Sequence, residues 1–252
     1  MMDAFCTKHA GKSILFVGDS TQALFYVAFV AMFRTPWLAW ANSTRQPCLE
    51  PVSLQKSQRN NVDIFDHSAD VCTARSTAPV NARFVRNEHL LHDDAASDKR
   101  AFRYEHRMSC RWYEASQRAD LLVLNRGAHV RQDDEFEREL SDTLHNLTAT
   151  KRADRIVYRS TVCAVPNCYD YQDPSLEPIE VNRSAPFGWG LFGEQNKIAR
   201  RLVDRVGAVF LDVHRATCMR PQRHFNDCMH YCVGTSGALD SLVELLLALW
   251  TI

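Results

Sequence analysis

The sequence predicts an α/β fold, a three-layer α/β/α sandwich around a parallel sheet of about five strands. Two observations support this prediction. Short, continuous apolar runs of the kind that form strands buried on both faces recur along the chain. Helix-compatible segments with one apolar face stand between these runs, and such an alternation is typical of a doubly wound parallel sheet. The 252 residues contain no internal repeat and no linker, so we expect one domain, residues 1–252.

The expected strands differ in clarity. Residues 13–17 form a continuous apolar run, Ser-Ile-Leu-Phe-Val, that ends at Gly18. Residues 120–125 and 208–212 show the same buried-strand pattern, whereas residues 82–86 alternate only moderately. In chain order, the expected strands are residues 13–17, 82–86, 120–125, 155–160 and 208–212.

Helices are expected between and after these strands. The clearest pattern lies in residues 133–148, where Phe136, Leu140 and Leu144 recur every four positions and therefore share one face. Gly207 suits the C-terminus of the helix that precedes it. In chain order, we expect helices at 21–33, 103–118, 133–148, 198–206 and 239–249, and loops at 41–62 and 162–190.

The composition excludes several classes of protein. Hydrophobic residues make up 46% of the chain and charged residues 24%, which excludes a disordered tail, a collagen-like repeat and a coiled coil. Thirty basic residues balance thirty acidic ones, and the net charge is +0. A chain without a basic excess is a poor candidate for non-specific nucleic-acid binding, so we expect no nucleic-acid partner.

Cysteines and sequons bear on the location of the protein. Nine cysteines and three N-glycosylation sequons, at Asn42, Asn146 and Asn182, favour a lumenal or extracellular domain. The first residues lack the apolar core of a signal peptide, and no apolar stretch is long enough to span a bilayer. A secretory location therefore requires a longer protein, with any membrane attachment outside this chain. Otherwise the protein is cytoplasmic.

Residues suited to nucleophilic catalysis follow the expected strands. In a parallel sheet the active site lies at the carboxyl ends of the strands. Ser20 stands at the first strand-to-helix turn, which suits a nucleophile, although Asp19 or Ser20 could instead only cap the helix. Asp227 and His230, three residues apart after the last expected strand, offer a base and its orienting carboxylate. A surface ion pair is the simpler interpretation of these two residues.

Candidate hydrogen-bond donors for an oxyanion follow a middle strand of the predicted sheet. Asn125 through its amide and Gly127 through its backbone N–H are candidates, although an ordinary turn at the end of a strand explains both residues as well. The sequence has no dinucleotide fingerprint, no phosphate-binding loop after a strand and no Gly-x-Ser-x-Gly elbow. Nucleotide binding and the α/β-hydrolase elbow are therefore disfavoured.

A zinc site is the alternative use of the segment around His230. Possible ligands gather there, and a looser second pair of cysteines precedes them. The possible ligands are His224, Asp227, Cys228, His230 and Cys232, with Cys163 and Cys168 as the second pair. The ligand spacing fits only half of a zinc motif, so we predict no metal and no bound cofactor.

The motifs in this order resemble a known family. Ile14-Leu-Phe-Val-Gly-Asp-Ser20 resembles the first block of the SGNH, or GDSL-like, hydrolases. Asp227-Cys-Met-His-Tyr-Cys232 resembles the Asp-Cys-x-His-Trp/Tyr-Cys signature of the PC-esterase branch. That branch includes the trichome-birefringence-like polysaccharide O-acetyltransferases and the lumenal domain of a sialic acid O-acetyltransferase. Residues 120–129 and 158–168 are similar to its middle blocks, whereas residues 41–118 match nothing.

Two departures accompany this resemblance. Thr21 stands where the namesake motif has Leu, and Cys163-Ala-Val-Pro166 stands where related sequences tend to carry Pro-Gly-His. If that His shapes the pocket, substrate choice differs in this chain.

The resemblance implies a serine-dependent acyl transfer. Ser20 would be the nucleophile, His230 the general base and Asp227 its orienting carboxylate. An acyl-enzyme on Ser20 would pass its acetyl group to water or to a sugar hydroxyl, so the chain would be a carbohydrate acetylesterase or an O-acetyltransferase that needs an acetyl donor. Gly18, Asp19, Asn125, Gly127 and Arg159 are the candidates for oxyanion or substrate binding. The alternative is an inactive domain that binds a glycan or a partner protein.

The resemblance also implies disulfides and a secretory location. Carried over by position, it pairs Cys6 with Cys232 and Cys168 with Cys228, with Cys163 as the competitor for Cys168. These bridges would hold the loop around His230. They would also place the protein in the Golgi lumen or outside the cell.

Overall fold

The computed structural model describes residues 1–33, 66–90, 111–130, 132–224, 227–233 and 238–251. Within them, six strands form one sheet in the order β2-β3-β1-β4-β5-β6. Their bounds are Ser13–Gly18 (β1), Asp66–Val71 (β2), Val80–Arg86 (β3), Leu121–Leu124 (β4), Ile156–Arg159 (β5) and Val209–Leu211 (β6). Every neighbouring pair is parallel except β2 with β3, which is antiparallel.

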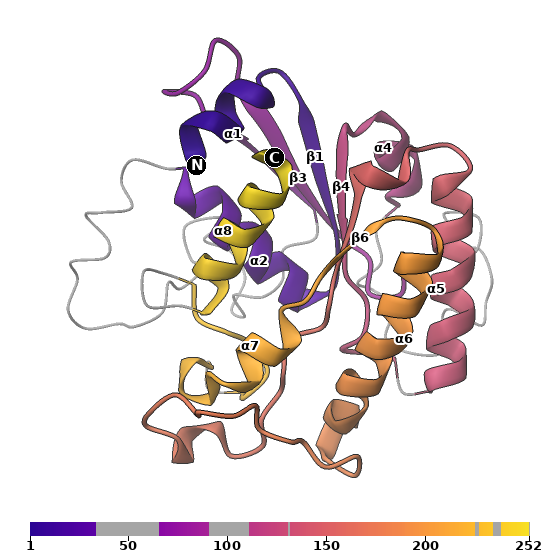
Figure 1. Cartoon of the computed structure of the whole chain (residues 1–252), viewed down its shortest axis with the longest axis vertical. Helices are drawn as coiled ribbons and strands as arrows, with labels where there is room; N and C mark the ends of the chain where they lie inside the picture. The colour runs from indigo at the N-terminus through magenta and orange to yellow at the C-terminus, as the bar shows by residue number, and fades with distance from the viewer. Residues whose placement is uncertain (34–65, 91–110, 131, 225–226, 234–237, 252) are drawn as a thin grey trace.

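Helices cover both faces of the sheet and make three layers. Their bounds are Met2–Lys8 (α1), Ser20–Met32 (α2), Tyr113–Arg118 (α4), Asp133–Thr148 (α5), Phe192–Arg205 (α6), His214–Cys218 (α7) and Ala238–Thr251 (α8). Figure 1 shows α1, α2 and α8 on one side of the strands and α4, α5 and α6 on the other. Alternate strand residues enter the two cores, as Phe16 does on the α2 side and Leu15 on the α5 side. The predicted three-layer α/β architecture is confirmed.

The five predicted strands are all present, with ends that differ by one or two residues from those expected. The sheet nevertheless corrects the prediction of parallel strands alone, because β2 adds an antiparallel edge. Its sequence, Asp-His-Ser-Ala-Asp-Val, is mostly polar, and four of its six residues are not buried. An edge strand with one face exposed to solvent has no continuous apolar run. A search for such runs therefore does not predict β2. The expected loop at residues 41–62 lies outside the described residues.

The parallel register brings the ends of the central strands together. Gly18 is in register with Arg86 at the end of β3, and Val17 is in register with Leu124 at the end of β4. The backbone N–H of Asn125 donates to the carbonyl of Val17 at 3.0 Å, which continues this alignment beyond β4. The loops that follow β1, β3 and β4 therefore start side by side at the carboxyl edge of the sheet.

Candidate active site

Ser20 is the first residue of α2, and the carboxylate before it caps the helix. Asp19 Oδ1 accepts hydrogen bonds from the backbone N–H groups of Thr21 (2.8 Å) and Gln22 (3.4 Å) and from the Thr21 hydroxyl (2.6 Å). The capping role considered for Asp19 is thus present. It takes up the N–H groups of the second and third helical residues, and within the described residues the N–H of Ser20 makes no hydrogen bond.

The structure brings together the three residues predicted as a triad. Ser20 Oγ lies 2.7 Å from His230 Nε2, and His230 Nδ1 is hydrogen-bonded to Asp227 Oδ2. The Asp227 pKa is lowered to about 2, because the hydrogen bonds and charge of His230 outweigh the burial that would raise it. An ionised carboxylate only accepts, so His230 Nδ1 carries the proton and Nε2 is left to accept the Ser20 hydroxyl hydrogen.

A tight turn lets the Asp227 carboxylate reach the imidazole of His230, three residues later in the sequence. Asp227 Oδ1 accepts the backbone N–H groups of Met229 (3.1 Å) and His230 (3.0 Å), so the carboxylate folds back over its own loop. Cys228 adopts a left-handed conformation with φ 60°, which closes the turn. With its position fixed by one oxygen, the carboxylate presents the other oxygen to the imidazole.

The loop that carries His230 is fastened to its surroundings at several points. Cys228 forms a disulfide with Cys168, and its carbonyl accepts the backbone N–H of Val165 at 3.1 Å. The Tyr231 hydroxyl donates to the Thr217 carbonyl at 2.7 Å. These fastenings come from the loop between β5 and α6 and from α7, elements distant in sequence from Ser20.

A buried arginine lies beneath the first turn of α2. Arg159, at the end of β5, is fully buried and donates from Nη2 to the Thr21 hydroxyl (2.9 Å) and from Nε to Gln22 Oε1 (2.6 Å). Burial lowers its pKa to about 10, against the attraction of Asp19. Burial would raise the pKa of Asp19, but the charges of His129 and Arg159 outweigh it and lower that pKa.

The burial of Arg159 does not support its assignment as a substrate-binding candidate. With no exposed surface, its guanidinium bonds to Thr21 and Gln22 from inside the protein, and its charge, together with that of His129, favours the ionised form of Asp19.

The loop after β4 lies against Asp19 through its backbone. The N–H of Ala128 donates to Asp19 Oδ2 at 3.3 Å, while the N–H of Gly127 makes no hydrogen bond within the described residues. Gly127 has φ 156°, and a Cβ there would lie 2.1 Å from Thr161 Oγ1. No larger residue fits without displacing Thr161.

Asn125 and Gly18 serve packing in the structure. The two hydrogens of the Asn125 amide point to the Arg159 carbonyl (3.1 Å) and to Thr161 Oγ1 (3.4 Å). The amide therefore ties β4 to β5, and the expected donation from it to an oxyanion is not supported. A Cβ at Gly18 would lie 2.8 Å from the Gln22 Cβ, so the missing side chain lets α2 start close to β1.

The disulfides confirm one expected pairing and correct another. Cys168 pairs with Cys228, as expected, but Cys6 pairs with Cys72 and not with Cys232. The N-terminal helix lies beside the end of β2, where Cys72 follows Val71. Cys232 is also disulfide-bonded.

The competitor for Cys168, Cys163, pairs with Cys218. The zinc alternative required Cys163, Cys168 and Cys228 as thiolates, and the disulfides occupy all three sulfurs. His214 lies beside Cys163 and Cys218 in a group within 4.8 Å, but the joined sulfurs do not provide the thiolates a metal needs.

A polar cluster that the sequence reasoning left without a role adjoins this edge. Arg86, at the end of β3, donates to Glu88 Oε1 at 3.0 and 2.6 Å, and His129 Nε2 lies 3.6 Å from the same oxygen. Asn87 holds the segment in place by donating its N–H to the Gly18 carbonyl at 3.0 Å. The sequence could have indicated this cluster through the charged pair Arg86 and Glu88 at the end of a strand. Residues 82–86, however, predicted that strand only weakly.

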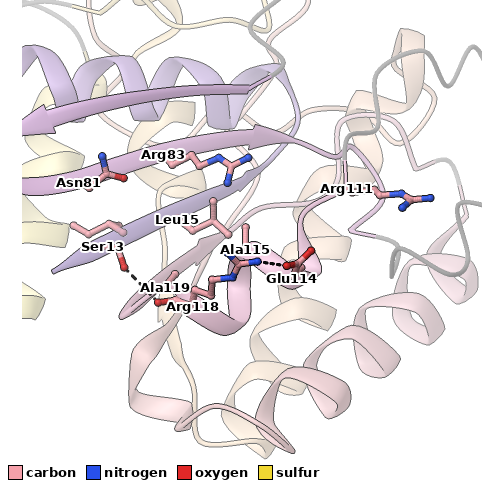
Figure 2. Close-up of a pocket in the computed structure, with 10 residues that line it drawn as sticks. Ser13, Leu15, Asn81, Arg83, Arg111, Glu114, Ala115, Arg118 and Ala119 are labelled. Carbon is pink, nitrogen blue, oxygen red and sulfur yellow. Dashed lines mark hydrogen bonds and ion pairs between the residues drawn. The ribbon is translucent and has the colours of Figure 1, made fainter.

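A cavity of about 330 Å³ lies at the opposite end of the sheet. Figure 2 shows it beside the first residues of β1 and β3 and against α4, with the side chains of Arg83, Arg111 and Arg118 around it. Since it adjoins the amino ends of the strands, it is separate from the Ser20 edge. Among the described helices, none has the length and apolar character needed to cross a membrane.

Comparisons with known proteins find likeness in structure alone. No protein-family model matches the chain, and no curated protein matches it in sequence. An α/β hydrolase from the metagenome of Lake Arreo, Spain, is similar at 13% identity and TM-score 0.48, over 96% of this chain and 95% of that one. The acetylxylan esterase of Geobacillus stearothermophilus is similar at 11% identity and TM-score 0.49, over 97% and 96%. Likeness at this level carries no argument about activity, which has to come from the site.

Proposed function

We propose that the protein is a serine-dependent enzyme that removes or transfers acetyl groups on glycan hydroxyls. The observation that carries the chemistry is the hydrogen-bonded chain Ser20–His230–Asp227, in which Ser20 Oγ is 2.7 Å from His230 Nε2. The choice of acetyl and glycan rests on the resemblance to the PC-esterase branch of the SGNH hydrolases, to which we assign the chain. An acetyl donor is needed only for transfer.

The first half-reaction forms an acyl-enzyme. His230 Nε2 takes the Ser20 hydroxyl proton while Oγ bonds to the ester carbonyl carbon, and the carbonyl oxygen becomes an oxyanion. The N–H groups of Ser20 and Gly127, which have no hydrogen-bond partner among the described residues, are the donors we assign to that oxyanion. As the intermediate collapses, the carbon–oxygen bond to the alcohol breaks, and the alcohol leaves with the proton from His230. Asp227 stabilises the imidazolium in between.

The second half-reaction runs the same steps with a new acceptor. Water or a sugar hydroxyl gives its proton to His230 and attacks the acyl carbon, and Ser20 regains its proton when the bond to Oγ breaks. Water yields an esterase, and a sugar yields a transferase. The disulfides among buried cysteines support an oxidising compartment, the secretory lumen or the exterior.

Turnover of p-nitrophenyl acetate by the purified protein tests this function. We expect turnover by the wild-type chain, none above background with Ser20→Ala, and covalent labelling of Ser20 by a fluorophosphonate located by mass spectrometry. A folded protein with neither turnover nor labelling would refute the proposal and favour a binding domain.

A further inference from the structure

The loop between β5 and α6 presents an aromatic side chain to solvent. Figure 1 shows this loop crossing the molecule beyond the carboxyl ends of the strands. Phe187 is 70% exposed, although large apolar side chains are usually buried. Its backbone has φ 58° and ψ 15°, a left-handed conformation that is rare for a bulky residue. Such outliers persist only where their surroundings enforce them, and they gather at functional sites.

The turn around Phe187 is closed by hydrogen bonds and a close backbone contact. The Asn182 carbonyl accepts the N–H of Ala185 at 2.8 Å, and Asn182 Oδ1 accepts the N–H (2.9 Å) and hydroxyl (2.8 Å) of Ser184. A Cβ at Gly190 would lie 2.0 Å from the Asn182 carbonyl oxygen, so the two arms of the turn are in close contact. Phe187 is therefore held outward by a well-bonded turn.

The exposed ring continues inward through a second aromatic residue. The rings of Phe187 and Trp189 have centroids 5.5 Å apart and planes tilted by 42°. Trp189 is half-buried and packs, as Met229 does, against a small cluster made of Ala128, Ala164 and Phe192. Phe187 thus forms the outer end of an aromatic surface whose inner end is fixed in the protein.

This cluster and the Met229 side chain that packs against it adjoin the candidate active site on two sides. Ala128 follows Gly127, and its N–H donates to Asp19, next to Ser20. Met229 immediately precedes His230. Trp189 therefore packs against the same cluster as the two loops that flank the nucleophile, and a substrate longer than its reacting group would extend toward the aromatic surface.

We propose that Phe187 and Trp189 form a stacking platform for a pyranose ring of the substrate, next to the sugar that carries the ester. This inference rests on the proposed function. A pyranose combines an apolar C–H face, which suits a flat aromatic ring, with a polar edge. A membrane surface fits less well, because binding to anionic lipid favours unpaired basic residues beside the apolar group. The neighbouring Arg183 instead pairs with Asp133 at 2.7 Å.

The test compares a small ester with an acetylated oligosaccharide. The kcat/KM values of wild type and variants are measured on p-nitrophenyl acetate and on partially acetylated cellotetraose and xylotetraose. Phe187→Ala should lower the ratio of tetraose to small-ester kcat/KM about tenfold, mainly through KM, because one stacking contact is lost. Phe187→Tyr keeps the ring and should keep the ratio. Leu176→Ala, on the same loop at a residue 91% exposed, is the matched control and should change neither substrate.

Three results would overturn the platform. They are an unchanged ratio in Phe187→Ala, an equal loss in Phe187→Tyr, and turnover of the small ester by a wild-type chain that neither binds nor uses either tetraose. If the wild type fails on p-nitrophenyl acetate and is not labelled at Ser20, the proposed function fails by itself. The platform is then judged by calorimetric binding of unacetylated tetraoses to wild type and Phe187→Ala.

The chain's own glycan at the Asn182 sequon is the rival source of a sugar ring. The same ratio is therefore measured on protein from a glycosylating and a non-glycosylating host. An equal effect of Phe187→Ala in both preparations supports the substrate as the occupant. An effect confined to glycosylated protein would assign the platform to the attached glycan and overturn the proposal.

Discussion

Removing the Cys168–Cys228 disulfide should damage catalysis more than its effect on stability explains. The bridge closes a loop of 60 residues, for which the chain-entropy model gives about 4 kcal/mol. It also fixes Cys228, which stands between Asp227 and His230 in a left-handed turn. Without it, we expect the loop to shift relative to Ser20. A misplacement of about 1 Å costs on the order of 10²-fold in rate.

The Cys6–Cys72 bridge supplies a matched control. It closes 66 residues, so the same model again gives about 4 kcal/mol, but it joins α1 to the end of β2, away from the loop of His230. The double variants Cys168→Ala/Cys228→Ala and Cys6→Ala/Cys72→Ala should therefore lose similar unfolding free energy in urea. Only the first should lose about 10²-fold in kcat/KM on p-nitrophenyl acetate, at a temperature where circular dichroism shows both folded.

Two outcomes would refute this reasoning. Equal losses of activity in the two folded variants would mean that the bridge acts through global stability alone. Full activity without the Cys168–Cys228 bridge would mean that hydrogen bonds and packing suffice to hold His230. Mild reduction of the wild type gives a further check, because activity should fall before the near-UV signal of the core is lost.

Four further predictions follow from the site. Ser20→Ala should reduce kcat to background and Asp227→Asn should reduce it about 10⁴-fold, with far-UV circular dichroism unchanged in both. Gly127→Ala should cost about 1–3 kcal/mol in urea unfolding and lower kcat, since the new Cβ meets Thr161 Oγ1 at 2.1 Å; native stability and rate would contradict the geometry. Arg159→Met should cost about 1–3 kcal/mol, because it leaves buried Gln22 Oε1 without its donor and removes one of the two charges that favour ionised Asp19, and a neutral effect would count against these roles. The lowered pKa of Asp227 stabilises the fold fully above its ordinary pKa of 3.8, and this stabilisation is lost as the pH falls toward 2, so the stability difference between wild type and Asp227→Asn should shrink over that range in acid titrations.

The sheet was largely predictable because its central strands are buried on both faces. Runs such as residues 13–17 and 120–125 are apolar without interruption, and few other structures need that pattern. The edge strand β2 escaped prediction for the same reason, since its polar residues face solvent and its pairing with β3 is a tertiary contact. The sequence also predicts the position of Ser20, because a strand that ends at Gly18 and is followed by a helix puts this residue at the carboxyl edge of the sheet.

The pairing of Asp227 with His230 could be anticipated locally, since a spacing of three residues lets one turn bring carboxylate and imidazole together. Their meeting with Ser20, 210 residues away in sequence, depends on the register of the parallel strands. Only the tertiary structure decided the roles of Asn125 and Arg159. The sequence places both residues at the ends of strands near the site, but in the fold their side chains bond to other buried groups. The tertiary structure also decided the partner of Cys6. Sequence patterns record what each segment buries, whereas disulfide partners and buried hydrogen bonds depend on which segments the completed fold brings into contact.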